Sequence, residues 1–246
     1  MEIANITQIL RENGKPEPPL QRFVYRRNGN ELKEFQRAAR EYIPAFVVDE
    51  SIEPLVSTLI AWTLCDDSNA HAVSIADGST VSADMFKGFY IAGPTGSGKT
   101  TLLYAYDCWL RTRRMQLATY GHMRDLLLPK FGAKDICREF RQYGDEALDI
   151  VRRLPIVLID DIGADDKESS YMGSKVDVIA ELILYRADNP DCITWYTSNL
   201  PLRDPTVTQG NPLLDRYGAR VVSRLVGSCN YLKLVGDDRR LKQPPR

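Results

Sequence analysis

The run "GPTGSGKT", residues 93–100, constrains the fold of this chain more than any other feature. It satisfies the pattern G-x-x-x-x-G-K-[ST], in which a glycine-rich loop and the first turn of a helix point backbone N–H groups at phosphate oxygens. The apolar run "FYIA" precedes it and "TTLLYAYDCWL" follows it, as a buried strand and a helix would. We therefore predict a phosphate-binding loop between a strand and a helix.

Two side chains of this loop have specific uses. Lys99 is expected to reach the β- and γ-phosphates of a nucleotide, and Thr100 is expected to bind Mg²⁺. The alternative is a glycine-rich connection without a ligand, which does not require a strand before it and a helix after it. The predicted nucleotide-binding residues are Gly93, Pro94, Thr95, Gly96, Ser97, Gly98, Lys99, Thr100 and Thr101.

Beyond the loop, short apolar runs alternate with stretches at helical spacing. The apolar runs are "GFYIAG", "QLATY", "IVLID", "CITWYTS" and "NYLKLVG", and the helical stretches include "TTLLYAYDCWLRTRR" and "KVDVIAELILYRA". This alternation indicates a parallel sheet covered by helices on both faces. We predict an α/β fold with a parallel five-stranded sheet flanked by helices.

The first 45 residues read differently from the rest of the chain. "NITQILRENG" predicts a short helix, "KPEPP" an extended break and "ELKEFQRAAREYI" a second helix. These pieces carry too little apolar surface for a core of their own, so we predict a docking arm or small helical appendage over residues 1–45 and one domain over residues 46–246. That domain begins with the packed helix "DESIEPLVSTLIAWTLC", followed by a surface loop, "DDSNAHAVSIADGSTVSAD".

Two of the expected strands end in polar side chains. "LPIVLIDDIG" runs into Asp160, which we expect to hold Mg²⁺, and Asp161, which we expect to polarise an attacking water. "CITWYTSNL" ends in Thr197, Ser198 and Asn199, and the Asn199 amide could bond both that water and the γ-phosphate. The alternatives are solvated loop acids and an ordinary ending of a strand.

"RYGARVVSRL", residues 216–225, places three arginines four residues apart. On a helix, Arg216, Arg220 and Arg224 would form one row, with the apolar residues between them on another face. Asp215 is the only acid between residues 213 and 227. We therefore predict a row of arginines without local partners, and a solvated cationic face is the alternative.

Taken together, "GPTGSGKT", "VLIDDIG", "ITWYTSNL" and "YGARVVSRL" followed by "GDDRR" resemble the AAA+ ATPases of the DnaC/DnaI helicase-loader family, relatives of DnaA and the IstB ATPases. The resemblance covers roughly residues 85–241 and implies a P-loop AAA+ core with ATP and Mg²⁺. It implies that Arg224 is an arginine finger for ATP bound by the adjacent subunit of a homo-oligomer, with Arg220 as its companion. Arg239 or Arg240 would be a second phosphate sensor, unless "GDDRR" is a plain basic tail. The helical lid would be absent or minimal.

The resemblance also implies a function. It is that of an ATP-dependent helicase loader in the initiation of DNA replication, an assembly switch that places a replicative DnaB-like helicase on single-stranded DNA. An IstB-like ATPase that regulates DNA transposition is the alternative. A P-loop small-molecule kinase is disfavoured because it would carry an arginine-rich lid in its own chain, and an inert nucleotide-binding scaffold because no catalytic residue is missing.

The formal net charge of −1 provides no general attraction to nucleic acid, so DNA contact would depend on local patches. The family's initiator-type members contact single-stranded DNA through a helical insertion, which here corresponds to residues 123–153. A single-strand site requires cations and stacking rings. The candidates are Arg124, Lys130, Lys134, Arg138, Arg141, Phe131, Phe140 and Tyr143. A solvated mixed-charge helix is the alternative.

Five cysteines without a CxxC pair argue against a zinc ribbon and a disulfide framework and favour a reducing compartment. The N-terminus "MEIANITQIL" lacks the cationic start and apolar core of a signal peptide. No apolar run approaches the roughly 20 residues that span a bilayer. We expect a cytoplasmic protein that is neither exported nor embedded in a membrane.

Overall fold

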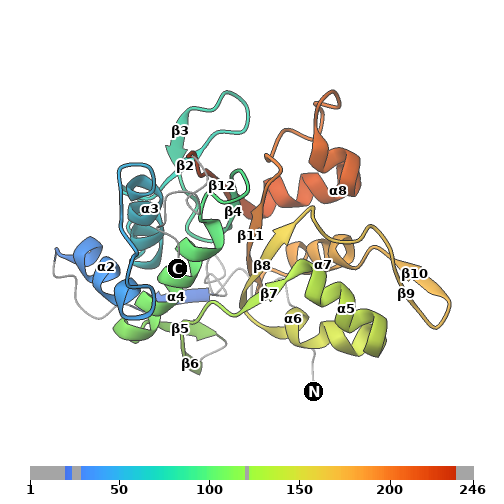
Figure 1. The fold of residues 1–246 in the computed structure, drawn as a ribbon, viewed down its shortest axis with the longest axis horizontal. Helices are drawn as coiled ribbons and strands as arrows, with labels where there is room; N and C mark the ends of the chain where they lie inside the picture. Colours follow the sequence, from blue (N-terminus) through green and yellow to red (C-terminus); the bar gives the residue numbers. More distant parts are fainter. Residues whose placement is uncertain (1–19, 24–28, 120–121, 237–246) are drawn as a thin grey trace, which may run out of the picture.

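A parallel sheet forms the centre of the fold in the computed structural model (Figure 1). The structure describes residues 20–23, 29–119 and 122–236. The five strands of the sheet lie in the order β12-β4-β11-β8-β7, and every neighbouring pair is parallel. The predicted α/β fold is therefore confirmed. The strands are β4 (Gly88–Ala92), β7 (Lys130–Gly132), β8 (Ile156–Ile162), β11 (Ile193–Ser198) and β12 (Cys229–Lys233).

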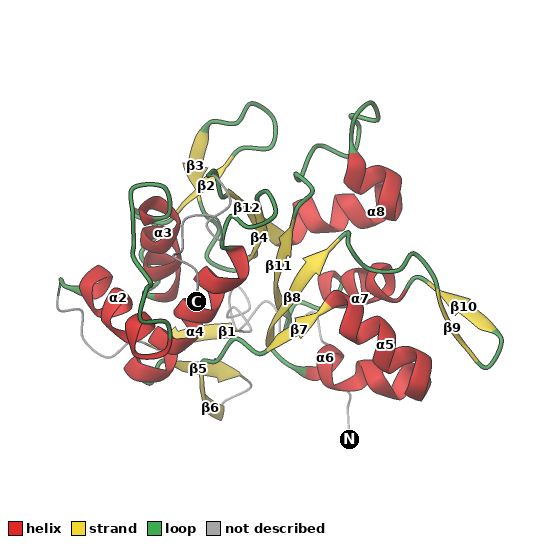
Figure 2. Ribbon diagram, in the orientation of Figure 1, coloured by secondary structure: helices red, strands yellow, loops and turns green. Residues whose placement is uncertain are grey.

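Helices cover both faces of this sheet (Figure 2). Alternate residues of a strand point to opposite faces, so Phe89 and Ile91 join one apolar cluster while Tyr90 and Ala92 join the other. The first cluster includes side chains of α3 (Glu53–Thr63) and α4 (Lys99–Arg113). The second includes side chains of α5 (Ala133–Tyr143), α6 (Asp149–Arg153), α7 (Val178–Ala187) and α8 (Pro212–Ser228).

One predicted strand lies elsewhere. "QLATY" contains β5 (Gln116–Thr119), which pairs antiparallel with β1 (Leu20–Phe23) and β6 (His122–Asp125) in a separate three-stranded sheet. The fifth strand of the parallel sheet is β7, whose sequence is only "KFG". The prediction was wrong because so short a strand has no apolar pattern, whereas "QLATY" does.

The predicted helix "ELKEFQRAAREYI" is α2 (Glu31–Tyr42), and its apolar face packs against α4. Phe35, Ala38 and Ala39 are buried in the same cluster as α3 and α4, and the Phe35 ring lies 6.0 Å from that of Trp109. α2 therefore contributes to the core, while a domain boundary at residue 45 stays a prediction. The predicted helix "NITQILRENG" lies outside the described residues.

Two hairpins complete the fold. The predicted surface loop contains β2 (His71–Val73) and β3 (Thr80–Ser82), and an unpredicted hairpin of β9 (Ser169–Tyr171) and β10 (Ser174–Val176) lies between β8 and α7 (Figure 1). In the part of the chain that the structure describes, no helix has both the length and the apolar character to cross a bilayer.

A buried arginine connects three elements, α7, β11 and α6, on the second face. Arg186 of α7 is 1% exposed and donates from Nε to the Thr194 hydroxyl (2.7 Å) and from Nη2 to the Ile193 carbonyl (3.1 Å). Its Nη1 donates to the carbonyls of Val151 and Leu154, at the end of α6 and just after it. Burial lowers the pKa of Arg186. Its guanidinium thus satisfies carbonyls that the end of α6 leaves open.

We expect Arg186→Lys to lower the free energy of unfolding by about 2–4 kcal/mol, because an ammonium group cannot reach all of these acceptors and buried unpaired carbonyls are costly. Urea unfolding measures the difference. The matched control is Arg153→Lys, in an exposed ion pair with Asp149 (2.9 Å), which should change the same free energy by less than about 0.5 kcal/mol. Equal effects of the two substitutions would refute this role for Arg186.

Candidate functional site

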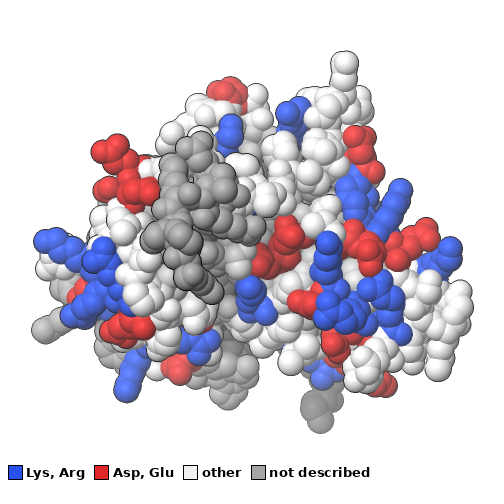
Figure 3. All heavy atoms as spheres, viewed as in Figure 1, with Lys and Arg blue, Asp and Glu red and all other residues white. Residues whose placement is uncertain are grey.

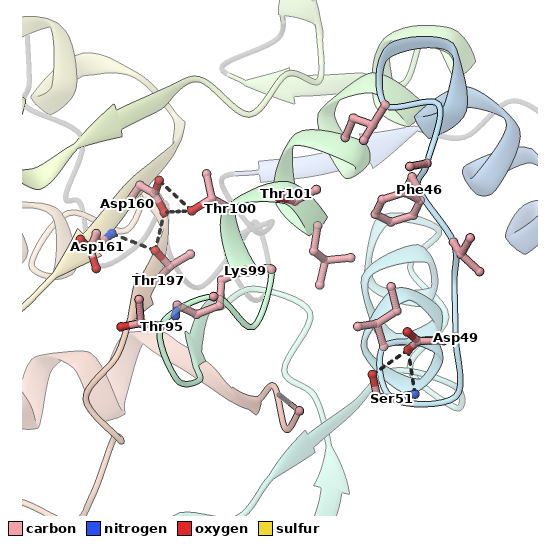
Figure 4. A pocket seen from close by; sticks show the side chains of 18 of the residues that line it. Phe46, Asp49, Ser51, Thr95, Lys99, Thr100, Thr101, Asp160, Asp161 and Thr197 are labelled. Atoms are coloured by element: carbon pink, nitrogen blue, oxygen red, sulfur yellow. Dashed lines mark hydrogen bonds between the residues drawn. The ribbon is translucent and has the colours of Figure 1, made fainter. Parts of the chain in front are cut away.

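A cavity of about 590 Å³ lies at the carboxyl edge of the sheet (Figure 4). Parallel strands end at the same edge, so the segments that follow β4, β8 and β11 meet there although they are far apart in the sequence. The cavity brings together most of the predicted site residues. They are Thr95, Gly96, Gly98, Lys99, Thr100, Thr101, Asp160, Asp161 and Asn199.

The glycine-rich loop lies as predicted between β4 and α4. Gly98 has a φ of +93° directly before the helix, a conformation that residues with a Cβ rarely adopt. A Cβ on Gly93 would lie 2.7 Å from the Leu234 carbonyl oxygen, so the close approach of the loop to the residue after β12 requires glycine. Ser97 is buried, and the carbonyls of Gly93 and Pro94 accept hydrogen bonds from Lys99 Nζ at 2.7 and 3.1 Å.

Lys99 also connects the loop to the strand that ends in Asn199. Its Nζ donates to Asn199 Oδ1 at 2.7 Å, and Asn199 Nδ2 donates to the Asp161 carboxylate at 3.3 Å. The Asn199 amide therefore bridges a cation of one segment and a carboxylate of another. Such a bridge can respond to any anion that takes Lys99 as its partner.

Asp160 is the centre of a cluster of oxygen atoms. The Thr100 hydroxyl lies 3.1 Å from each of its carboxylate oxygens, and the Thr197 hydroxyl donates to Oδ1 (Figure 4). Lys130 Nζ lies 3.4 Å from Oδ2 and offsets part of the negative charge. A hydroxyl and a carboxylate are ligands that suit Mg²⁺, which favours oxygen and binds through few protein groups. Thr100 and Asp160 therefore fit the predicted metal site.

Asp161 has an unusual backbone conformation. Its φ is +62°, which costs a residue with a Cβ about 1–3 kcal/mol. Its N–H donates to the Thr197 hydroxyl at 2.8 Å, and its side chain is exposed at the cavity. The left-handed turn thus sends two consecutive carboxylates into different surroundings, with Asp160 buried and Asp161 open to solvent.

Thr197 is a site residue whose role the sequence did not reveal. It is fully buried in β11, and its single hydroxyl serves both acids by donating to Asp160 and accepting from the Asp161 N–H. In the sequence it is only part of a polar strand ending. The role of Thr197 can be recognised only once β8 is known to pair with β11.

The cavity also has an apolar wall that the sequence did not indicate. Phe46 lies on the side opposite the acids (Figure 4). Ile43, Val47 and Ile52 also line the cavity, and all four residues come from the connection between α2 and α3. Arg40 on α2 donates to the Phe46 carbonyl at 2.9 Å and so holds this connection. An apolar wall beside a phosphate loop suits a flat ring attached to a phosphate chain. The only signal was the apolar run "IPAFVV" between two helices.

The predicted row of arginines is interrupted, and two of its members have partners. Gly218 has φ 79° and ψ 165°, which kinks α8 and separates Arg216 from the later turns. Arg216 forms ion pairs with two acids, as described below, and Arg224 pairs with Asp188 at 2.8 Å. No acid nearby in the sequence pairs with Arg216 or Arg224, as predicted, and their partners are acids from distant parts of the sequence that the fold brings close. Among the described residues, Arg220 is exposed and makes no ion pair.

Arg220 and Arg224 do not line the large cavity. Arg224 instead borders a second cavity of about 290 Å³ with Lys87 and Cys192, which precede β4 and β11. The second cavity therefore lies at the amino edge of the sheet, opposite the glycine-rich loop. Arg239 and Arg240 lie outside the described residues.

Of the described residues predicted to contact DNA, only some are exposed and without an ion pair. Phe140 is buried against the ring of Tyr171, so its prediction as a stacking residue was wrong, since the apolar face of α5 packs inward. Arg141 pairs with Asp166 at 2.6 Å, and Arg138 pairs with Asp135. Lys134 and Tyr143 are exposed, Phe131 is half-buried and Arg124 lies on β6. Basic and acidic side chains alternate over this part of the surface (Figure 3).

The fold is similar to that of two solved structures. The DnaC helicase loader aligns with a TM-score of 0.50 and 20% identity, over 82% of this chain and 99% of that one. A protein described as a primosome component from Streptococcus pyogenes serotype M3 aligns with a TM-score of 0.51 and 18% identity, over 87% of this chain and all of that one. No protein-family model and no curated protein matches the sequence. These two structures therefore share the α/β fold of this chain.

Thr197→Val tests how the acids are held, because it keeps the shape of the side chain and removes the hydroxyl. We expect the free energy of unfolding, measured with urea, to fall by about 1–3 kcal/mol, since the Asp161 N–H loses its acceptor. The control is Thr206→Val, which removes an exposed hydroxyl bonded to Asp204 and should cost less than about 0.5 kcal/mol. A cost for Thr197→Val no greater than that of the control would contradict this role.

Proposed function

We propose that the protein binds ATP with Mg²⁺ in the large cavity and hydrolyses the ATP. The observation that carries the proposal is the meeting of Lys99, Thr100 and Asp160 at one edge of a parallel sheet. The backbone N–H groups of the loop and of the first turn of α4 bind phosphate oxygens. The flat base of the nucleotide lies against Phe46 and the apolar wall.

Each side chain of the site has one task in hydrolysis. Lys99 exchanges its acceptors for oxygens of the β- and γ-phosphates, and Thr100 and Asp160 would hold Mg²⁺. When bound, the metal would neutralise charge on the phosphates. Asp161, exposed at the cavity, orients and polarises the attacking water, while Asn199 bonds the same water or the γ-phosphate. Loss of the Asn199–Lys99 bond would signal that the γ-phosphate is present.

We further propose that Arg224 acts on ATP bound by a neighbouring subunit, with Arg220 as its companion at the interface. Arg224 and the glycine-rich loop are at opposite edges of the sheet, and β4 alone spans about 16 Å at about 3.3 Å per residue. Arg224 is therefore too distant for the site in its own chain. Its exposed ion pair with Asp188 is worth about 0–1 kcal/mol, so a phosphate can displace Asp188 readily.

Mixing two variants tests the arrangement in trans. Arg224→Ala should keep ATP affinity but lower hydrolysis by about 10³-fold or more, because the transferring phosphoryl group loses a cation. Lys99→Ala should lose ATP binding, yet its intact Arg224 should restore turnover in Arg224→Ala subunits. Phosphate release by the two variants, alone and mixed, measures the rescue.

The control for this experiment is Arg153→Ala, which removes another exposed, ion-paired arginine and should hydrolyse ATP as the wild type does. A mixture no more active than its components, together with a rate per subunit that does not vary with protein concentration, would exclude the arrangement in trans.

For the biological role, we propose a helicase loader in replication initiation, in which ATP-dependent assembly places a DnaB-like helicase on single-stranded DNA. The support is the motif order and the fold shared with the DnaC helicase loader. The exposed Lys134 and Tyr143 are the surface proposed for the DNA strand. A regulator of transposition would have the same ATPase site and a different client.

Capture of the client separates these roles. The immobilised protein in ATP should retain a hexameric helicase from a lysate of its own host, and retention should fall in ADP. Lys99→Ala should retain little in either nucleotide, because ATP would not bind. Mass spectrometry identifies the captured protein; a transposase would replace the loader role with the transposition role, and capture by Lys99→Ala equal to that by the wild type would refute an ATP switch.

A further inference from the structure

A buried carboxylate that the catalytic scheme does not use lies four residues beyond Asp161. The Asp165 side chain has no exposed area and accepts hydrogen bonds from the Gly163 N–H (2.8 Å), the Tyr217 hydroxyl and the Arg216 guanidinium. A buried carboxylate is stable only when it is paired and hydrogen-bonded. The segment after β8 is therefore attached to α8 by charge as well as by packing.

Tyr217 of α8 forms two hydrogen bonds of this attachment. Its hydroxyl donates to Asp165 and accepts the Gly163 N–H at 2.8 Å. Burial and the neighbouring Asp165 carboxylate raise the pKa of Tyr217, so its proton stays in place. The Gly163 N–H therefore has two acceptors, one from Asp165 and one from α8.

Arg216 completes the network from α8. Its side chain is 12% exposed, pairs with Asp177 at 2.6 Å as well as with Asp165, and lies 4.2 Å from the centre of the Tyr217 ring. Asp177 is also the N-cap of α7, where it accepts from the Ala180 N–H. One guanidinium thus joins the segment after β8, the start of α7 and the first turns of α8.

The attached segment holds Asp161 in its unusual conformation. Asp161 and Gly163 have φ of +62° and +87°, so the backbone is irregular on either side of Ile162, where the register of β8 against β11 shifts. Hydrogen bonds fix this conformation at three successive residues. The Asp161 N–H bonds Thr197, the Ile162 carbonyl accepts from the Ser198 hydroxyl at 2.7 Å, and the Gly163 N–H bonds Asp165 and Tyr217. The third of these is shared between Asp165, two residues further along the same segment, and Tyr217 of α8.

We propose that Asp165, Tyr217 and Arg216 are positioning residues that hold the backbone of Asp161, and with it the carboxylate that orients the attacking water. The inference rests on the proposed ATPase function. The network acts within one subunit, on its own site. The kink at Gly218 follows Tyr217 directly, so the first turns of α8 serve this site and the later turns carry Arg220 and Arg224.

The first test is Tyr217→Phe, which keeps the buried ring and removes the hydroxyl. A misplaced catalytic group costs about 10- to 100-fold in rate, so we expect kcat for ATP hydrolysis to fall by that amount. The Michaelis constant for ATP should change by less than about 3-fold, because the phosphate loop is untouched. Asp165→Asn should act in the same way, and Arg216→Lys should lose less, because it keeps one ion pair.

The matched control is Tyr106→Phe. The Tyr106 hydroxyl is also buried, and it bonds the Thr63 hydroxyl between α3 and α4, on the opposite face of the sheet from Tyr217. Both Tyr→Phe variants should lower the urea midpoint similarly, but only Tyr217→Phe should lower kcat. Unchanged kcat in Tyr217→Phe, or an equal decrease in the two variants, would overturn the inference. If Asp165→Asn does not fold, the kcat of Tyr217→Phe alone tests the inference.

Mixing Tyr217→Phe subunits with Lys99→Ala subunits distinguishes a defect in the ATP site of the same subunit from a displaced Arg224. Lys99→Ala subunits carry an intact α8, so they would restore Tyr217→Phe turnover if the substitution had only displaced Arg224. We expect no restoration, because the defect lies in the same subunit as the bound ATP. Restoration to the level of the Arg224→Ala mixture would overturn the inference.

A wild-type protein without Lys99-dependent hydrolysis would refute the proposed ATPase, and this inference with it. Normal wild-type hydrolysis with an unaffected Tyr217→Phe would refute the inference alone.

Discussion

Parallel pairing of β4, β11 and β8 is the constraint on which the rest of the structure depends. It carries the glycine-rich loop, the paired acids and the Thr197–Asn199 segment to one edge of the sheet, although about 100 residues separate the first from the last. Buried on both faces, the three strands cannot shift in register without exposing large apolar side chains. The positions of the polar groups at the edge are therefore determined by the core beneath them.

Three carboxylates within six residues are stabilised in three different ways. Asp160 is bonded by two hydroxyls and faces Lys130, Asp161 is exposed with one amide partner, and Asp165 is buried with Arg216. Like charges so close would otherwise repel one another. Because each has different partners, one can bind a metal, one can act on water and one can serve as a structural anchor.

The two cavities lie at opposite edges of the sheet. The large cavity opens at the carboxyl edge, and Arg224 borders the small one at the amino edge. α8 connects the two edges, since its first turns bond the segment that follows the paired acids and its last turn leads into β12. In the proposed oligomer, the same helix would thus serve the ATP of its own subunit and the ATP of a neighbour.

The sequence alone predicted the phosphate loop, the paired acids and the α/β class, because these depend on local spacing: a glycine pattern, an apolar run and the residues next to it. It mistook β5 for a strand of the central sheet, and it did not reveal Phe46, Thr197 or the partners of Arg216. Those features depend on which strands are neighbours and on contacts such as Arg216–Asp165, between residues 51 positions apart. Local periodicity carries no information on such pairs. Only the tertiary structure decided them, because the burial of one core determines which distant charges and hydroxyls meet.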